Sequence, residues 1–354
     1  MTPEWLALPT RLARLGKLVA WSIVLLGMAY QAAADWPALP DRAPVPAGNP
    51  MTPDKIALGR KLFFDPALSR NGKVACATCQ DAKTGADGRS ISAGIGGKTG
   101  RRNAPTVWNA AFQARLFWDG RAASLEGQAK SPLINPVEMG MKDYAAVERA
   151  LAARPAYQAE FSKVFGGARP LSIDNIAAAI ATFERTLITP DTPYDRYARG
   201  DKTALDEAQL RGMRLFEGYG CRICHSGPNF SGASLFDTST PFRAFPALPM
   251  FATPYVARYR LTQDLGRADP GARQGLWRVP SLRNVALTAP YFHNGAVDRL
   301  EDAVRIMTAA QLGRPIDRLD HNSVADRDVA DIAAFLGSLS SDRLRAGRAG
   351  RARK

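Results

Sequence analysis

The chain carries one order of motifs twice, and this internal repeat restricts the folds that it can adopt. Each copy runs from a helical segment through a Cys-x-x-Cys pair and a long loop to an Arg-Asn dipeptide and an aromatic-x-x-Gly motif. Residues 117–120 match residues 292–295 at a constant offset, and we match the Arg-Asn dipeptide at 102–103 with the one at 283–284. Two copies with unequal insertions indicate a duplicated domain rather than a solenoid.

Helical periodicity is the main secondary-structure signal. Apolar residues follow a 3.6-residue spacing through 173–187, with Ser172 as N-cap, and again through 329–336. Strand signals are scarce, and the Gly-rich stretch 85–101 is typical of a loop that covers something. We predict a mainly α protein of two similar domains, with a boundary near residue 200.

The charge pattern argues against a fold that coats nucleic acid. Lys and Arg number 47 against 33 Asp and Glu, but six of the basic residues stand without an acid in 343–354. We expect this basic tail, 340–354, to be disordered and solvated, with an anionic partner as the alternative.

The N-terminus has the pattern of an export signal. Basic residues precede an apolar run at 18–30, and three alanines follow at 32–34. The run is short for a membrane span, so we predict a signal peptide at 1–34, with a retained anchor as the alternative. A Pro-rich leader at 35–50 follows it. We therefore expect a periplasmic protein.

The second cysteine pair is a c-type haem attachment motif. Cys221 and Cys224 are followed at once by His225, and two thiols at this spacing add to the two vinyl groups of a porphyrin. The adjacent imidazole then lies under the iron as its proximal ligand. The competing interpretations are a redox dithiol, half of a zinc site and a structural disulfide.

The first cysteine pair lacks the histidine. Cys76 and Cys79 are followed by Gln80, whose amide oxygen is a weak iron ligand. The pair could form a disulfide or join the second pair in a four-cysteine zinc site, but the internal repeat favours a haem ancestry. The remaining histidines, His293 and His321, both lie far away in the second half.

Taken together, the motifs resemble those of the bacterial di-haem cytochrome c peroxidases and the related MauG-type enzymes. The resemblance spans residues 50–339. It implies two cytochrome c-like haem domains, a peroxidatic one at 51–200 and an electron-transfer one at 201–339. Besides the cysteine pairs it rests on Leu-Phe-Phe-Asp-Pro-x-Leu-Ser (62–69), Arg-Asn-Ala-Pro-Thr (102–106), Phe-Trp-Asp-Gly-Arg-Ala (117–122), Pro-Val-Glu-Met-Gly (136–140), Pro-Ser-Leu-Arg-Asn-Val (280–285), Ala-Pro-Tyr-Phe-His-Asn-Gly (289–295) and Leu-Glu-Asp-Ala-Val (300–304).

The resemblance implies roles for four residues of these motifs. His225 would be the proximal ligand and Met307 the distal ligand of the second haem, a pair that raises the reduction potential. Glu138 matches the acid–base residue above the peroxidatic iron. Trp118 matches a tryptophan that lies between the two haems.

The resemblance also implies a calcium site and an open first haem. Asn103 and the backbone carbonyls of Thr288 and Pro290 match the calcium ligands of the family. Ile95 stands where some peroxidases carry a distal histidine. Without that histidine, we expect the first iron to need no reductive activation.

We therefore predict a periplasmic peroxidase that reduces hydrogen peroxide to water. Its electrons would come from a small cytochrome c or a cupredoxin, and by resemblance it could be a homodimer. Two alternatives stay open: peroxide-dependent oxidation of a protein substrate, as in the MauG type, and an electron-transfer cytochrome with haem only at Cys221 and Cys224. Gln80 favours the second alternative, whereas Met307 favours a plain peroxidase.

Overall fold

The structure is a computed structural model that describes residues 36–83, 85–238, 241–247, 254–267, 275–311 and 324–351. The chain from residue 37 onward forms one compact unit, and the domain boundary near residue 200 stays a prediction. The expected signal segment and His321 lie outside the described residues.

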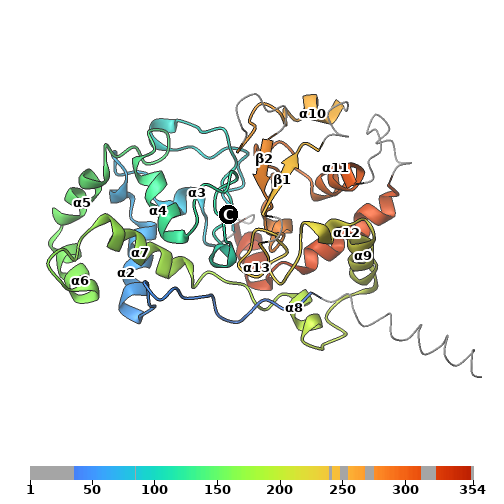
Figure 1. Ribbon diagram of the computed structural model, residues 1–354, viewed down its shortest axis with the longest axis horizontal. Helices are drawn as coiled ribbons and strands as arrows, with labels where there is room; N and C mark the ends of the chain where they lie inside the picture. The colour runs from blue at the N-terminus through green and yellow to red at the C-terminus, as the bar shows by residue number, and fades with distance from the viewer. Residues whose placement is uncertain are drawn as a thin grey trace, which may run out of the picture. The chain divides into compact units, whose positions relative to one another are not determined.

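The described part is mainly helical, as predicted (Figure 1). Its α-helices are α2 (Pro53–Phe64), α3 (Cys76–Cys79), α4 (Leu125–Ile134), α5 (Tyr144–Ala152), α6 (Pro155–Phe165), α7 (Ile173–Glu184), α8 (Pro193–Ala198), α9 (Glu207–Gly218), α10 (Pro254–Arg258), α11 (Leu300–Gln311), α12 (Asp326–Ser338) and α13 (Asp342–Arg351). Short 3-10 helices are η1 (Pro66–Leu68), η2 (Ile95–Gly97), η3 (Ala110–Phe112), η4 (Cys221–Ile223) and η6 (Val285–Leu287). Strands β1 (Phe242–Phe245) and β2 (Gly275–Arg278) pair antiparallel.

Both helices expected from periodicity are present as α7 and α12. Ser172 caps α7, because its hydroxyl accepts a hydrogen bond from the Asn175 amide at 3.3 Å. The apolar face of α7 is buried through Ile176 and Ile180. The helix ends at Glu184, before Leu187, where the chain tightens into a turn through the Thr186 amide and the Phe183 carbonyl.

The two helix pairs show the duplication directly. Helix α2 packs on α7, and α9 packs on α12 (Figure 1). Each pair meets at a glycine: a Cβ on Gly59 would lie 1.9 Å from the Ala179 carbonyl oxygen, and one on Gly212 would lie 1.8 Å from that of Asp331. Any larger residue at either glycine would therefore push the paired helices apart.

The loops between the helices repeat as well. Phe117 and Phe292 adopt left-handed φ angles of 65° and 67°, and Gly120 and Gly295 follow with 65° and 57°. Side chains other than glycine rarely adopt this conformation, so its recurrence at matched positions is a property of the repeated unit. The match between residues 117–120 and 292–295 is thus present in the backbone.

The backbone also corrects one detail of the sequence alignment. Asn109 and Asn284 both have a φ of 61°, and each donates from Nδ2 to Thr189 Oγ1, at 2.7 Å and 3.0 Å. The counterpart of Asn284 is therefore Asn109. The match with Asn103, which rested on the shared Arg-Asn dipeptide, is wrong, because Asn109 and not Asn103 shares this φ angle and this contact with Thr189.

The basic C-terminus differs from the expected solvated tail. Residues 342–351 form α13, and Leu344 is buried in the core of the first half. The Arg343 guanidinium lies 4.7 Å from the centre of the Trp108 ring. Charge alone predicted disorder, but one leucine and one stacked arginine hold this helix against apolar partners.

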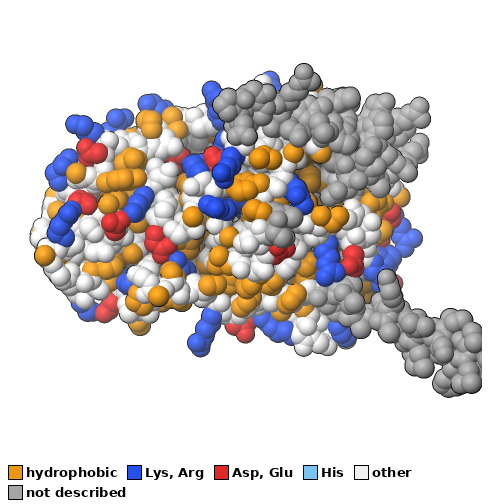
Figure 2. Space-filling model, in the orientation of Figure 1, with side chains coloured by type: hydrophobic (Ala, Val, Ile, Leu, Met, Phe, Trp, Pro, Cys, Tyr) orange, Lys and Arg blue, Asp and Glu red, His pale blue; other side chains and the backbone are white. Residues whose placement is uncertain are grey.

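The surface is mixed in charge. Lys and Arg side chains are scattered among acidic and apolar ones over the face drawn in Figure 2. No helix among the described residues is long and apolar enough to cross a bilayer.

Candidate functional site

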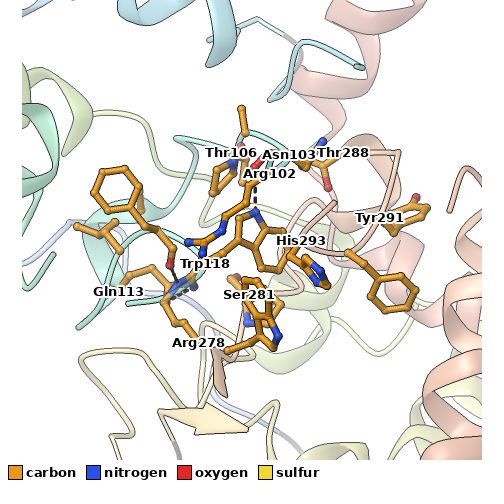
Figure 3. Close-up of a pocket in the computed structure, with 18 of the residues that line it drawn as sticks. Arg102, Asn103, Thr106, Gln113, Trp118, Arg278, Ser281, Thr288, Tyr291 and His293 are labelled. Carbon is orange, nitrogen blue, oxygen red and sulfur yellow. Dashed lines mark hydrogen bonds between the residues drawn. The ribbon is translucent and has the colours of Figure 1, made fainter. Parts of the chain in front are cut away.

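One cavity of about 740 Å³ brings most of the predicted site residues together. Part of its wall, around Trp118 and His293, is drawn in Figure 3. Segments from both halves of the repeat line it. The predicted residues along its wall are Cys76, Cys79, Gln80, Asn103, Trp118, Glu138, Cys221, Cys224, His225, Thr288, Pro290 and Met307.

The second cysteine pair and the histidine that follows it line the cavity. The imidazole of His225 is held by a 3.1 Å hydrogen bond from Nδ1 to the Phe230 carbonyl oxygen, which leaves Nε2 as the unprotonated nitrogen. Burial lowers the pKa of His225 to about 4, so the ring is neutral at pH 7. Met307, on α11, lines the same cavity with a half-buried side chain.

The first cysteine pair fits attachment but not axial ligation. Cys76 and Cys79 bound the short helix α3, and Gln80 follows as its C-cap. An amide therefore stands where the second half has the neutral imidazole of His225. The two thiols fit a porphyrin's vinyl groups, whereas Gln80 does not fit the role of a strong proximal ligand.

The thiols do not match the other uses considered for them. All four cysteines lie in the described part of the chain and are free. Burial raises the pKa of Cys76 and of Cys221 to about 12, which disfavours a thiolate at either of these two positions. The described residues also contain no cluster of three or more His, Cys, Asp or Glu side chains that could hold zinc.

Glu138 lines the cavity close enough to the first cysteine pair to act on the charge of both thiols. Asn135 donates from Nδ2 to Glu138 Oε1 at 2.6 Å, which fixes the carboxyl group. Burial raises the pKa of Glu138, and Arg121 and the Asn135 hydrogen bond oppose this only in part. A partly desolvated carboxylate of this kind is a better proton acceptor than one in water.

The loop 85–101 covers the Glu138 segment, as its composition suggested. A Cβ on Gly94 would lie 2.0 Å from the Val137 carbonyl oxygen, and the Ile95 amide donates to the Glu138 carbonyl at 2.8 Å. Ile95 itself is buried against Gly140. The position that the resemblance matches to a distal histidine of some peroxidases is therefore filled by a buried apolar side chain.

Trp118 belongs to an aromatic group that spans the two halves. Its Nε1 donates to the Asn103 carbonyl at 2.9 Å, and its ring meets Trp277 edge-on at 6.5 Å between ring centres. The other face of this group is His293, stacked on Trp277 at 4.0 Å. Trp118 and His293 occupy equivalent positions of the repeat, so Trp277 lies between a residue and its own counterpart.

The sequence analysis missed Trp277. It precedes the Pro-Ser-Leu-Arg-Asn-Val motif by only three residues, but a lone tryptophan in a short segment carries no periodic signal. The pairing of β1 with β2, and the Trp277 Nε1 hydrogen bond to the Phe245 carbonyl at 3.0 Å, become visible only in three dimensions.

The three residues expected around calcium border the same cavity. Asn103 is buried, its amide donates to the His293 carbonyl at 2.8 Å, and its Nδ2 donates to the Arg89 carbonyl at 2.9 Å. Figure 3 shows Asn103 and Thr288 on the same side of the pocket. These contacts leave Asn103 Oδ1 and the backbone carbonyl oxygens of Thr288 and Pro290 available as ligands. Calcium prefers oxygen ligands of this type.

Glu184 is a second buried carboxyl group in the cavity that the sequence analysis missed. It is 2% exposed, and its Oε2 has no hydrogen-bond partner in the described structure. When the two helix pairs are matched at their glycine contacts, the position equivalent to Glu184 in the second half is Leu336. The signal was therefore an acid at a position where the duplicate has an apolar residue.

Burial raises the pKa of Glu184 to about 8, despite the adjacent Arg185. The unfolded chain would ionise it near 4.5, so the folded state holds this proton more tightly. Stability should thus fall as the pH rises from about 4.5 to about 8, by up to about 5 kcal/mol from this group.

We expect Glu184→Gln to remove that decline. The measurement is urea unfolding of both proteins at pH 5 and pH 8. Glu160→Gln, at a partly exposed glutamate of α6 that pairs with Lys61, is the control and should follow the wild type. Equal pH dependence in Glu184→Gln and wild type would contradict a protonated Glu184.

Comparison with known proteins agrees with this geometry. The family model described as di-haem cytochrome c peroxidase matches residues 53–203. The cytochrome c551 peroxidase of Pseudomonas aeruginosa is 43% identical over 312 residues, which cover 88% of this chain and 85% of the relative. The methylamine utilization protein MauG of Methylorubrum extorquens is 35% identical, with 92% and 95% covered.

A solved structure is similar over most of its length. It is described as a MauG-like protein associated with microbial copper homeostasis, and it is 30% identical with a TM-score of 0.73. The match covers 86% of this chain and 95% of that one.

Proposed function

The chain belongs to the di-haem cytochrome c peroxidase family and is an oxidoreductase that acts on peroxide, and from this premise we propose how it works. It reduces hydrogen peroxide to two waters in the periplasm, with electrons from a small cytochrome c or a cupredoxin. The observation that carries the proposal is the single cavity shared by both cysteine pairs, His225 and Glu138.

The residues of the cavity divide the work between the two halves. Cys221 and Cys224 would carry the second haem, and His225 and Met307 would hold its iron. Cys76 and Cys79 would carry the first haem. When bound, haem supplies an iron that exchanges single electrons and binds peroxide.

Glu138 moves the proton that peroxide reduction requires. Cleavage of the O–O bond needs one proton to leave one oxygen of the peroxide and to reach the other. Because Asn135 occupies Oε1, Oε2 is the oxygen that accepts and returns this proton. Two electrons and two protons in total convert one peroxide to two waters.

The second half receives the electrons, and Trp118 relays them to the first half. The donors proposed are periplasmic, which agrees with an export signal at 1–34. The Trp118 ring is held in place by its hydrogen bond to the Asn103 carbonyl and by its contact with the Trp277 ring.

A specific observation favours a second candidate, an electron carrier with haem at Cys221 and Cys224 alone. Gln80 removes the imidazole from the first motif. Steady-state oxidation of reduced cytochrome c by hydrogen peroxide separates the two functions. The peroxidase proposal requires turnover that the Cys76→Ser/Cys79→Ser double variant loses while it keeps the second haem. If the wild type showed no turnover, the peroxidase proposal would be contradicted and the electron-carrier function would be supported.

We also propose calcium at Asn103, Thr288 and Pro290. Isothermal titration with calcium should give saturable binding in the wild type. Asn103→Ala, which removes the side-chain oxygen but neither backbone carbonyl, should weaken the binding at least tenfold. Equal affinity in both proteins, or no binding at all, would contradict the site.

A further inference from the structure

Arg278 is a buried cation without an anion. Three arginines are buried among the described residues: Arg185, Arg278 and Arg283. Arg283 has Asp195 at 2.6 Å, and Arg185 has Glu126 at 2.8 Å. Arg278 has no carboxylate within ion-pair distance in the described part of the chain. A buried unpaired charge is costly, so the fold that pairs the other two needs a partner here as well.

The guanidinium is fixed by neutral acceptors only. Its Nε donates to the Phe117 carbonyl at 2.8 Å, and Nη1 donates to Gln113 Oε1 at 3.2 Å and to the Val279 carbonyl at 3.3 Å (Figure 3). No described acceptor is left for Nη2. Asp119, whose charge acts on it, is already shared by Arg102 and Arg121.

Arg278 and Gln113 both line the 740 Å³ cavity. Gln113 is 9% exposed, and its Nε2 donates to no acceptor in the described structure. Two unused N–H donors on linked side chains, one of them cationic, match the two oxygens of a carboxylate. We propose that Arg278, supported by Gln113, is the binding site for a propionate carboxylate of the second haem.

The second haem is favoured over the first because of what surrounds Arg278. The Val279 carbonyl accepts a hydrogen bond from Ser231 Oγ at 2.8 Å, and Ser231 follows Phe230, which holds the His225 imidazole. The Pro280 carbonyl also acts on His225. The segment that carries Arg278 is therefore the one that seats the proximal histidine of the second half.

The inference rests on the proposed haem at Cys221 and Cys224, which the peroxidase and the electron carrier share. It is tested by redox titration of the holoprotein, in which the two haems are followed separately. The second haem, with His225 and Met307 as its proposed ligands, is expected to be low-spin, and the first haem, with no imidazole from its motif, is expected to be high-spin. A positive charge beside the propionate stabilises the reduced haem. Arg278→Gln should therefore lower the midpoint potential of the low-spin haem, and Arg278→Lys should restore most of it.

Two further variants make the result specific. Gln113→Glu places a carboxylate beside Arg278 without removing the arginine, and it should lower the same potential. Arg299→Gln is the control: Arg299 is exposed and is not among the residues that line the cavity, so solvent screens its charge. It should shift the potential much less.

Three outcomes would overturn the assignment. These are an unchanged low-spin potential in Arg278→Gln and Gln113→Glu, a shift confined to the high-spin haem, or an equal shift in Arg299→Gln. None of them depends on peroxide turnover. Failure of the peroxidase proposal would instead appear as lost turnover with the low-spin shift still present.

Discussion

Glu138→Gln is expected to lower kcat/KM for hydrogen peroxide by about 10²- to 10⁴-fold, the usual contribution of a positioned acid–base group. The amide keeps the size of the side chain and can still face Asn135, but it cannot accept a proton. Steady-state oxidation of reduced cytochrome c measures the loss. Glu207→Gln, at an exposed glutamate of α9 outside the cavity, is the matched control and should keep wild-type rates.

The pH profile separates a proton-transfer role from a structural one. The carboxylate form of Glu138 is the active one, so wild-type activity should fall as the pH is lowered. Because burial raises the pKa of Glu138, the midpoint of this fall should lie above the usual pKa range of a glutamate. Glu138→Gln should lose this acid limb and keep its haem content. A loss below about threefold, or an unchanged acid limb, would contradict the assigned role.

Gln80→His is expected to raise peroxide turnover. Imidazole donates more electron density to a haem iron than an amide does, and changes around a metal's ligands commonly alter activity by about 10- to 100-fold. The high-spin spectrum of the first haem should change with it, which gives a reading independent of turnover.

The mirror variant, His225→Gln, is the matched control because it creates the first motif in the second half. It should change the spectrum of the second haem from low-spin to high-spin and leave the spectrum of the first haem unchanged. If Gln80→His changed neither spectrum nor rate, the first pair would carry no haem that position 80 can reach.

The repeat made much of this fold and site predictable from sequence. Cysteine spacing identified Cys76 and Cys221 as equivalent, and periodicity located α7 and α12. These signals are local, since each depends on residues within one turn or one motif. The cavity then brings together the residues that those motifs carry.

The features that escaped prediction are non-local. Glu184 stands out only when α2 and α7 are compared with α9 and α12, because the equivalent residue of the second half is the apolar Leu336. Asn109 was passed over for Asn103 because identity of a dipeptide outweighed the backbone conformation that Asn109 shares with Asn284. Pairing between strands, which buries Arg278 without an acid, leaves no pattern along the chain.

The account stands or falls on how many porphyrins the chain holds covalently, and a pyridine haemochrome assay per mole of protein counts them. Two haems in the wild type and one in Cys76→Ser/Cys79→Ser are the predicted result. A single haem in the wild type, unchanged in that double variant, would contradict it.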